Sequence, residues 1–285
     1  MSKTYKVNNH LLGTNGALYS FDPFDVNNLP KNTILVRTSG GFMEQNPDVP
    51  SLISTYDAYC QTDNPNEYLV YKESNDWTNI LVGHTDITDI LGANTKSVYN
   101  LSAAFYWCRN LSSVALFDTS KVTNMDSTFD YNLHLPDVPL FDTSNVTSMD
   151  STFAYLGFSS IPQLDYSKVT TLRRCFSHCD SLKIANLSAP ECTSFYSTFY
   201  HDNAFGGYLD ASTRIPAVSC IPYMPKAVDV DHMYSNCRYM SYPYDVYNII
   251  KNNTNIETHN ETFYLAGDAN NIGSAQLAQI PSDWK

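Results

Sequence analysis

The sequence predicts a β-rich α/β solenoid built from about six units of 23 or 24 residues. The first observation is an internal repeat: residues 117–129 (FDTSKVTNMDSTF) return as residues 141–153 (FDTSNVTSMDSTF), with 11 of 13 positions identical. The second is an aromatic residue that recurs at nearly the same spacing. Self-similarity at a fixed period of roughly 20 to 50 residues is typical of solenoids, in which each unit buries its apolar face against its neighbours.

Each unit can be anchored on its recurring aromatic residue. These anchors are Phe105, Phe129, Phe153, Phe176, Phe199 and Tyr234. The residues seven and four positions before the anchor are almost all apolar, and the residue three positions after it is often Cys or Leu. These offsets place the side chains on one face of a helix, so we expect a helical segment of roughly ten residues in every unit.

A short strand should follow each helical segment. Its inward residues would be Val114/Phe117, Val138/Phe141, Ile161/Leu164, Ile184/Leu187 and Ile215/Val218. The loop after most strands carries Asp-Thr-Ser or a relative of it. Because Asp, Thr and Ser side chains accept backbone N–H groups, we interpret these loops as helix caps.

The flanking segments predict three domains: a β-rich N-terminal attachment domain (1–72), the repeats (73–242) and a C-terminal cap (243–285). In the first domain we expect a hairpin around Asn15-Gly16 and strands at residues 32–37 and 68–71. Residues 79–94 look like a degenerate first unit. In the cap we expect a helix at residues 244–251, a strand at 261–266 and a last short helix that Pro281 ends.

Composition excludes several classes of function. The net charge is −12 and there is no run of basic residues, so binding to nucleic acid or to an acidic membrane surface is not expected. There is no apolar stretch of about 18 residues, so we expect no membrane insertion. The first residues lack the apolar core of a secretory signal, so we expect the protein to stay in the cell or to leave without one, for example through lysis by a phage.

The seven cysteines do not indicate a disulfide framework. Their number is odd, and three of them (Cys108, Cys179 and Cys237) occupy the same position of the repeat. We therefore expect buried, reduced thiols that pack as small hydrophobic side chains. Cys175, His178 and Cys179 lie close together in the sequence, but a zinc site needs four ligands and no second pair stands at a suitable spacing.

No catalytic residue, cofactor or metal site is predicted. The sequence contains no Gly-x-Ser-x-Gly motif, P-loop or His-Glu-x-x-His motif, and its acidic pairs form no glycosidase pattern. We therefore expect a protein that is not an enzyme.

The pattern V-T-x-M-x-x-x-F-x-x-C-x-x-L … F-D-T-S-x-V resembles the BspA-type leucine-rich repeat of bacterial surface proteins and phage proteins. Val122, Thr123, Met125, Phe129 and the block 141–144 carry this resemblance, which covers about residues 80–242. The units on Phe153 and Phe199 depart from it because they lack the Cys. The resemblance implies a leucine-rich-repeat solenoid with a short parallel sheet on one face, used for adhesion or protein contact without catalysis. The N-terminal hairpin, residues 32–41 and the C-terminal LAQIPSDWK resemble parts of phage tail or virion-attached proteins.

One repeat position is the candidate ligand-binding surface. Two residues after the anchor stand Trp107, Tyr131, Tyr155, His178 and His201, then Asn236. Equivalent positions of stacked units align, so the five rings should form a column that could contact sugars or a protein loop. The alternative is that these rings only pad one unit against the next. The insertion at residues 201–213 is a second candidate surface.

Three hypotheses about function remain open. The first is a non-enzymatic phage virion protein, on the tail or particle surface, that binds a host-surface protein or glycan or another virion protein, with residues 1–72 as its attachment. The alternative is a bacterial cell-surface or secreted adhesin with the same repeats. An enzyme acting on a surface glycan is a third hypothesis. The sequence shows no heptad segment, so a homo-oligomer is left open.

Overall fold

The computed structural model describes residues 27–42, 53–183, 185–206, 217–269 and 271–285, together with the backbone of four two-residue strands that precede residue 27. The chain divides into two compact units, Met1–Asn145 (the first unit) and Val146–Lys285 (the second unit). Each is described by itself. The predicted domain boundaries after residues 72 and 242 stay predictions.

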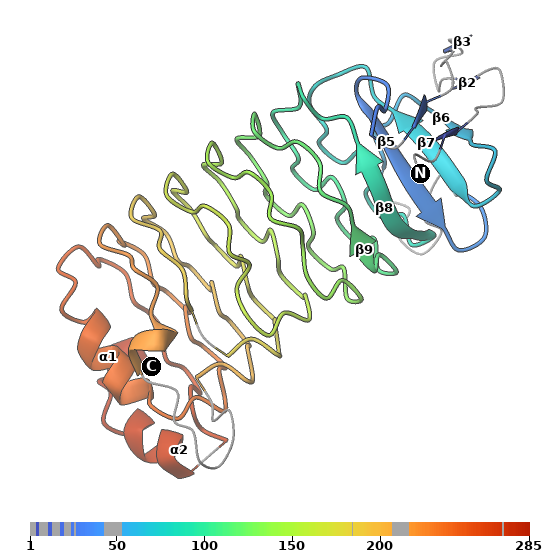
Figure 1. Ribbon diagram of the computed structural model, residues 1–285. Coiled ribbons are helices and arrows are strands. Elements are labelled where there is room, and N and C mark those ends of the chain that lie inside the picture. The colour runs from blue at the N-terminus through green and yellow to red at the C-terminus, as the bar shows by residue number, and fades with distance from the viewer. Residues whose placement is uncertain are drawn as a thin grey trace. The chain divides into compact units, whose positions relative to one another are not determined.

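The first unit contains a mixed five-stranded sheet in the order β6-β7-β5-β8-β9 (Figure 1). Its strands are β5 (Thr33–Thr38), β6 (Ala58–Gln61), β7 (Glu67–Tyr71), β8 (Ile87–Ala93) and β9 (Ser113–Val114). The pairs β6-β7, β5-β7 and β5-β8 are antiparallel, and β8-β9 is parallel. Leu35 and Leu69 are fully buried and belong to the core on one side of this sheet.

Short antiparallel pairs precede the sheet: β1 (Thr4–Tyr5) with β4 (Phe24–Asp25), and β2 (Leu11–Leu12) with β3 (Leu18–Tyr19). The predicted strands at residues 32–37 and 68–71 are confirmed by β5 and β7. The pair β2-β3 brackets the predicted hairpin turn, but Asn15 and Gly16 themselves lie outside the described residues.

The repeats form overlapping turns that hydrogen-bond from one repeat to the next. We call the residues from four before to two after the anchor the turn segment. In the first unit the N–H groups of Leu101, Ala103, Phe105 and Trp107 donate to the carbonyls of Asn124, Asp126, Thr128 and Asp130, over 2.9, 2.7, 3.1 and 2.9 Å. The residues between them close turns within the segment; Ala104 N–H, for example, donates to Leu101 O over 2.9 Å. Backbone groups are thus satisfied alternately within and between repeats.

Each turn segment contains two residues in the left-handed region. In the repeat on Phe105 these are Ala103 (φ 51°) and Trp107 (φ 63°), two positions before and two positions after the anchor. The same two positions have positive φ on either side of Phe153 and Phe176. A helix requires right-handed dihedrals at every residue, so a left-handed residue at every fourth position excludes one.

The anchors form stacked rings in the core. In the first unit the ring centroids of Phe105 and Phe129 lie 5.5 Å apart. In the second unit Phe153, Phe176, Phe199, Tyr234 and Phe263 follow one another at 5.7, 6.0, 5.8 and 5.5 Å, with interplanar angles of 10–21°. All of these anchors are fully buried. The predicted buried positions seven and four residues before each anchor are also confirmed.

The helices of the second unit lie near the C-terminus. They are α1 (Pro243–Ile250) and α2 (Asn271–Leu277), with the 3-10 turns η1 (Ala217–Cys220) and η2 (Ser282–Trp284). The predicted helix at residues 244–251 is confirmed by α1. The predicted strand at residues 261–266 is wrong, because this stretch is one more turn segment, anchored on Phe263 and bonded to the segment of Tyr234.

The predicted fold class, an α/β leucine-rich-repeat solenoid, is wrong. The regular structure of the described residues is mostly strand, in one mixed sheet, and the two short α-helices found there both follow residue 242. The helical segment expected in each repeat is a run of turns, and the expected parallel sheet is reduced to isolated bridges such as Asn100–Asn124 and Ser148–Thr171. Turns that place a left-handed residue at every fourth position give the same apolar spacing as a helix, which explains the error.

The predicted short strands are also mostly absent. Of the described candidates, Ser113–Val114 alone forms a strand, while Phe117, Phe141 and Ile161 are buried without one. Ile184 and Ile215 lie outside the described residues, as does the side chain of Val218. The expected caps are turns: the carboxylates of Asp118 and Asp142 each accept the N–H of the second residue onward over 3.0 Å.

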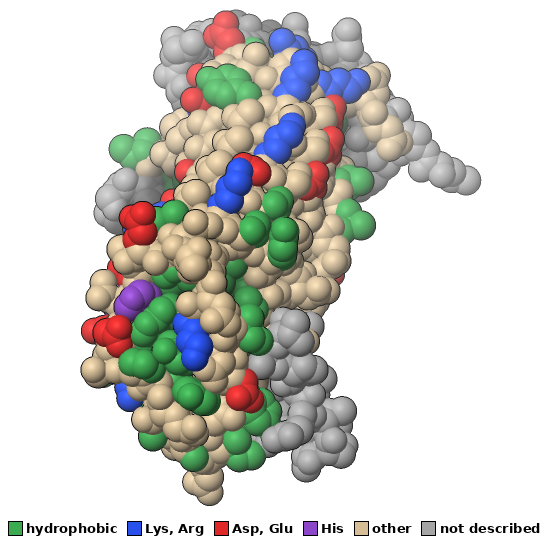
Figure 2. All heavy atoms as spheres, turned by 90° about the vertical axis from the view of Figure 1, so that its left-hand side faces the viewer, with side chains coloured by type: hydrophobic (Ala, Val, Ile, Leu, Met, Phe, Trp, Pro, Cys, Tyr) green, Lys and Arg blue, Asp and Glu red, His purple; other side chains and the backbone are tan. Residues whose placement is uncertain are grey.

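Charged side chains are sparse on the surface. Figure 2 shows a face on which Lys and Arg are interspersed with Asp and Glu, and uncharged side chains and backbone cover most of the area. Within the described ranges, neither α-helix has the length and apolar character needed to cross a bilayer.

Candidate functional site

The five predicted ring positions, Trp107, Tyr131, Tyr155, His178 and His201, occupy equivalent places in their turn segments. Each is the second left-handed residue of its segment, with φ between 60° and 63°. The backbone N–H of Trp107 donates to Asp130 O in the next repeat, and the backbone N–H of Tyr155 donates to Ser177 O in the same way. The backbone therefore fixes where each ring leaves the core, and all five rings are half-buried.

In the first unit two rings stack. The ring centroids of Trp107 and Tyr131 lie 4.5 Å apart with an interplanar angle of 35°. The guanidinium carbon of Arg109 lies 4.4 Å from the centroid of the Trp107 ring, a cation–π contact. Tyr106 meets both rings edge-on at 6.0 Å. The result is a half-exposed aromatic surface with a cationic neighbour.

In the second unit three rings stack. Tyr155 and His178 are nearly parallel, with centroids 4.3 Å apart and an interplanar angle of 8°, and His178 and His201 follow at 4.7 Å. Partial burial, together with the nearby His201, lowers the pKa of His178, against the opposing effect of Asp180. The neutral imidazole form of His178 is therefore favoured.

The expected alignment of rings is present within each unit. The same position carries Gly83 in the first unit, and Asn236 and Leu265 in the second; all three have positive φ. The sequence predicted this position for Asn236 but not for Gly83 or Leu265. The repeat of Gly83 has an aliphatic anchor, Leu81, and the repeat of Leu265 has an anchor at an unusual spacing, Phe263. The rings therefore occupy only the middle repeats.

The cysteines occupy the core. All seven are buried and free, as expected for packing thiols. The Sγ atoms of Cys108 and Cys179 donate to the carbonyls of the preceding anchors, Leu81 and Phe153, over 3.1 Å in both cases. Within the described part of the chain no cluster of three or more His, Cys, Asp or Glu side chains is arranged to hold a metal ion.

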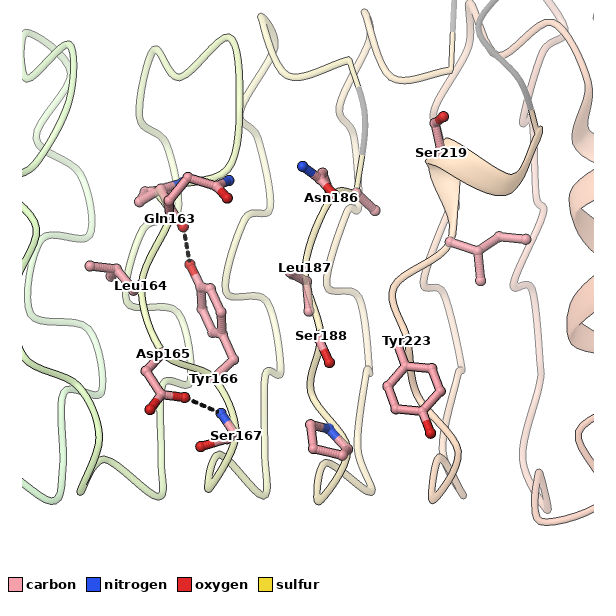
Figure 3. Close-up of a pocket in the computed structure, with 14 residues that line it drawn as sticks. Gln163, Leu164, Asp165, Tyr166, Ser167, Asn186, Leu187, Ser188, Ser219 and Tyr223 are labelled. Carbon is pink, nitrogen blue, oxygen red and sulfur yellow. Dashed lines mark hydrogen bonds between the residues drawn. The ribbon is translucent and has the colours of Figure 1, made fainter.

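A groove that sequence reasoning missed lies in the second unit. It has a volume of about 900 Å³ and runs between residues 162–167, 185–190 and 219–223 (Figure 3). No motif marks it, because the residues that face it differ from repeat to repeat. The second predicted surface, the insertion at 201–213, lies mostly outside the described residues.

One family model matches the chain. Residues 78–189 match a family described as "Mycoplasma protein of unknown function, DUF285". The match covers less than half of the chain and falls on the repeats on Leu81 to Phe176. Neither the curated proteins nor the solved structures give a match.

Proposed function

We propose that this protein is a non-enzymatic binding protein of a phage virion, located on the tail or the particle surface. Its repeats would contact a host-surface protein or glycan, or a second virion protein, and residues 1–72 would attach it to the particle. The observation that carries the proposal is the stacking of half-exposed rings within each unit, where the turn segments hold them in place. Rigid aromatic side chains offer a large contact area at low cost in conformational entropy.

The placement on a phage particle rests on the resemblance of the repeat to BspA-type leucine-rich repeats. That resemblance is carried by residues such as Val122, Met125 and Phe129. The wide rings of Trp107 and Tyr131 are suited to a surface ligand, because both residues remain partly exposed to solvent.

The test uses the full chain, labelled with a fluorophore, on a panel of intact bacterial cells that includes mycoplasmas. In the test variant Trp107, Tyr131 and Tyr155 are replaced together by Asn, the residue that stands at the equivalent position 236 and tolerates a left-handed backbone. The matched control replaces three exposed tyrosines outside the ring positions, Tyr99, Tyr239 and Tyr264, by Asn. We expect the test variant to lose at least 90% of bound fluorescence, in line with roughly 1.4 kcal/mol or more from these rings.

The control variant should bind as the unchanged protein does, and circular dichroism should show the same folded state for all three proteins. Equal binding by the test variant would remove the ring positions from the proposal. Failure of the unchanged protein to bind any cell would overturn the host-surface role.

A bacterial cell-surface adhesin is the second candidate. The family matched by residues 78–189 is described as a Mycoplasma protein, which favours a protein of a bacterial cell over a particle component. Immunogold labelling separates the two candidates: antibodies to this chain should decorate phage particles under the first proposal and the bacterial envelope under the second.

A further inference from the structure

We propose that the groove between residues 162–167, 185–190 and 219–223 binds neutral oligosaccharides. This site is separate from the ring positions and does not depend on the proposed function. Its volume of about 900 Å³ is near the upper end of the range of roughly 300 to 1,000 Å³ typical of small-molecule sites, which leaves room for a short oligosaccharide.

Two of the three segments that line the groove are bonded to each other, and the third is not bonded to its neighbour. Residues 185–189 are bonded to 219–223: Ala185 N–H donates to Ser219 O over 2.8 Å, and Tyr223 N–H donates to Leu187 O over 3.0 Å. In the described part of the chain, no hydrogen bond joins Asn186 or Ser188 to residues 162–167. The residues that line the groove come from all three segments (Figure 3).

The side chains that face the groove suit sugar hydroxyls. Residues 185–189 alternate between buried and exposed, so Asn186 and Ser188 point outward, as Gln163 does from the neighbouring segment. Primary amides and hydroxyls both donate and accept hydrogen bonds, which matches the dual character of a sugar hydroxyl. Figure 3 shows Gln163 and Asn186 at one end of the groove and Ser188 nearer the other end.

Tyr223 supplies a flat apolar surface beside these polar groups. Its side chain is 61% exposed, whereas its neighbours Pro222 and Met224 are buried. The ring could stack on the C–H face of a pyranose while its hydroxyl stays in water. An aromatic platform next to amides and hydroxyls is the composition that a sugar site requires.

The charge of the groove selects neutral sugars. Asp165 contributes a carboxylate to the lining, and the described lining includes no Lys or Arg. A uronic or sialic acid would meet like charge without a compensating cation, which costs affinity. We therefore expect the groove to bind neutral hexose oligomers and not acidic oligosaccharides.

The test measures binding of the full chain to maltohexaose, cellohexaose, mannohexaose and chitohexaose by calorimetry, with tetragalacturonate as the acidic comparison. We expect at least one neutral hexamer to bind, and Tyr223→Ala and Asn186→Ala each to weaken its binding tenfold or more. Tyr239→Ala is the matched control, because Tyr239 is 54% exposed in the same unit and does not line the groove. It should bind as the unchanged protein does.

Three outcomes would overturn the proposal. These are no binding of any neutral hexamer, binding that Tyr223→Ala leaves unchanged, and equal or tighter binding of tetragalacturonate. A peptide is the other occupant to be tested. An apolar pocket of about 420 Å³ shares Ile221 and Tyr223 with the groove and would fit a peptide side chain. If a displayed heptapeptide library yields peptides whose binding needs Tyr223 while all the sugars fail, the groove is a peptide site. Because the ring-position variant keeps Tyr223 and Asn186, failure here and failure of the proposed function are distinguishable.

Discussion

The residue three positions after the anchor decides how the carbonyl of the preceding anchor is satisfied. In three repeats a Cys thiol donates to it, and in the repeat on Phe129 the Nδ2 of Asn132 donates to Phe105 O over 3.0 Å. Asp202 occupies this position in the repeat on Phe199 and is fully buried. Its Oδ1 accepts Cys179 N–H over 2.7 Å, whereas its Oδ2 has no partner within the described residues. Burial raises the pKa of Asp202 well above its ordinary value, with a further contribution from Asp180.

Asp202→Asn should therefore stabilise the protein at neutral pH. A raised pKa in the folded state means that the folded chain holds the proton more tightly than the unfolded chain does. The stability of the native protein is then fully present below the unfolded pKa of about 4, and falls by up to roughly 1.4 kcal/mol per pH unit above it, until the folded pKa is reached. Asn carries no charge, so the variant should escape this loss. Urea unfolding between pH 4 and pH 8 measures the difference.

The gain from Asp202→Asn should grow with pH, to about 1–3 kcal/mol at pH 7, on the scale of the desolvation penalty of an unsatisfied buried group. The control is Asp137→Asn, because Asp137 is exposed and does not contribute to the raised pKa of Asp202. It should change stability by less than about 0.5 kcal/mol. A pH-independent difference between Asp202→Asn and the native protein would show that Asp202 ionises normally.

At the scale of the element, the turn segment keeps its first left-handed residue without relying on glycine. At the first of the two left-handed positions, φ lies between 51° and 56° in six successive repeats. The residues there are Ala103, Ser127, Ser151, Arg174, Ser197 and His232. Each such residue costs roughly 1 kcal/mol relative to Gly. The bonds between repeats offset this cost, since the N–H of Ala103 reaches Asp126 O over 2.7 Å.

Ala103→Gly should stabilise the protein by about 1 kcal/mol, because glycine adopts a positive φ without steric strain. The same change at Ala115, which is similarly half-buried but has no positive φ, should destabilise it by about 0.5–1 kcal/mol through lost backbone entropy. Chemical denaturation of the two variants beside the native chain measures both shifts. Loss of stability in Ala103→Gly as large as in Ala115→Gly would mean that the backbone at residue 103 is not left-handed.

The sequence predicted which side chains are buried better than it predicted the backbone that buries them. Val98, Leu101 and Phe105 are fully buried as expected. Their spacing of three and four residues fits a helix and a run of turns equally well, and nothing in the residue types at 103 or 107 indicates a positive φ. The ring positions could be predicted because equivalent residues of a repeat align. The groove could not, because it depends on where neighbouring segments separate.

At the scale of the whole molecule, thiols report on the integrity of both units. Cys60 and Cys108 belong to the first unit, and Cys175, Cys179, Cys192, Cys220 and Cys237 to the second. Burial raises the pKa of Cys60, Cys192 and Cys220 to about 12, and it also raises the pKa of the other four well above its ordinary value. Because the thiolate is the nucleophile, both low accessibility and raised pKa should keep these thiols unreactive.

An aromatic disulfide reagent, which releases a coloured thiol when it reacts, measures this reactivity. In the folded protein it should modify none of the seven cysteines in the time that a free thiol takes to react, and in denaturant it should modify all seven. Leu116→Cys provides the positive control, because residue 116 is 64% exposed and a thiol there should react at the rate of a small-molecule thiol. Mass spectrometry after a pulse of reagent at intermediate urea assigns each modified cysteine to its unit. Joint exposure of the thiols of both units would show that they unfold as one cooperative system, whereas earlier exposure of one set would show separate transitions. A native thiol that reacts as fast as the thiol introduced by Leu116→Cys would contradict the buried position of that native cysteine in the core.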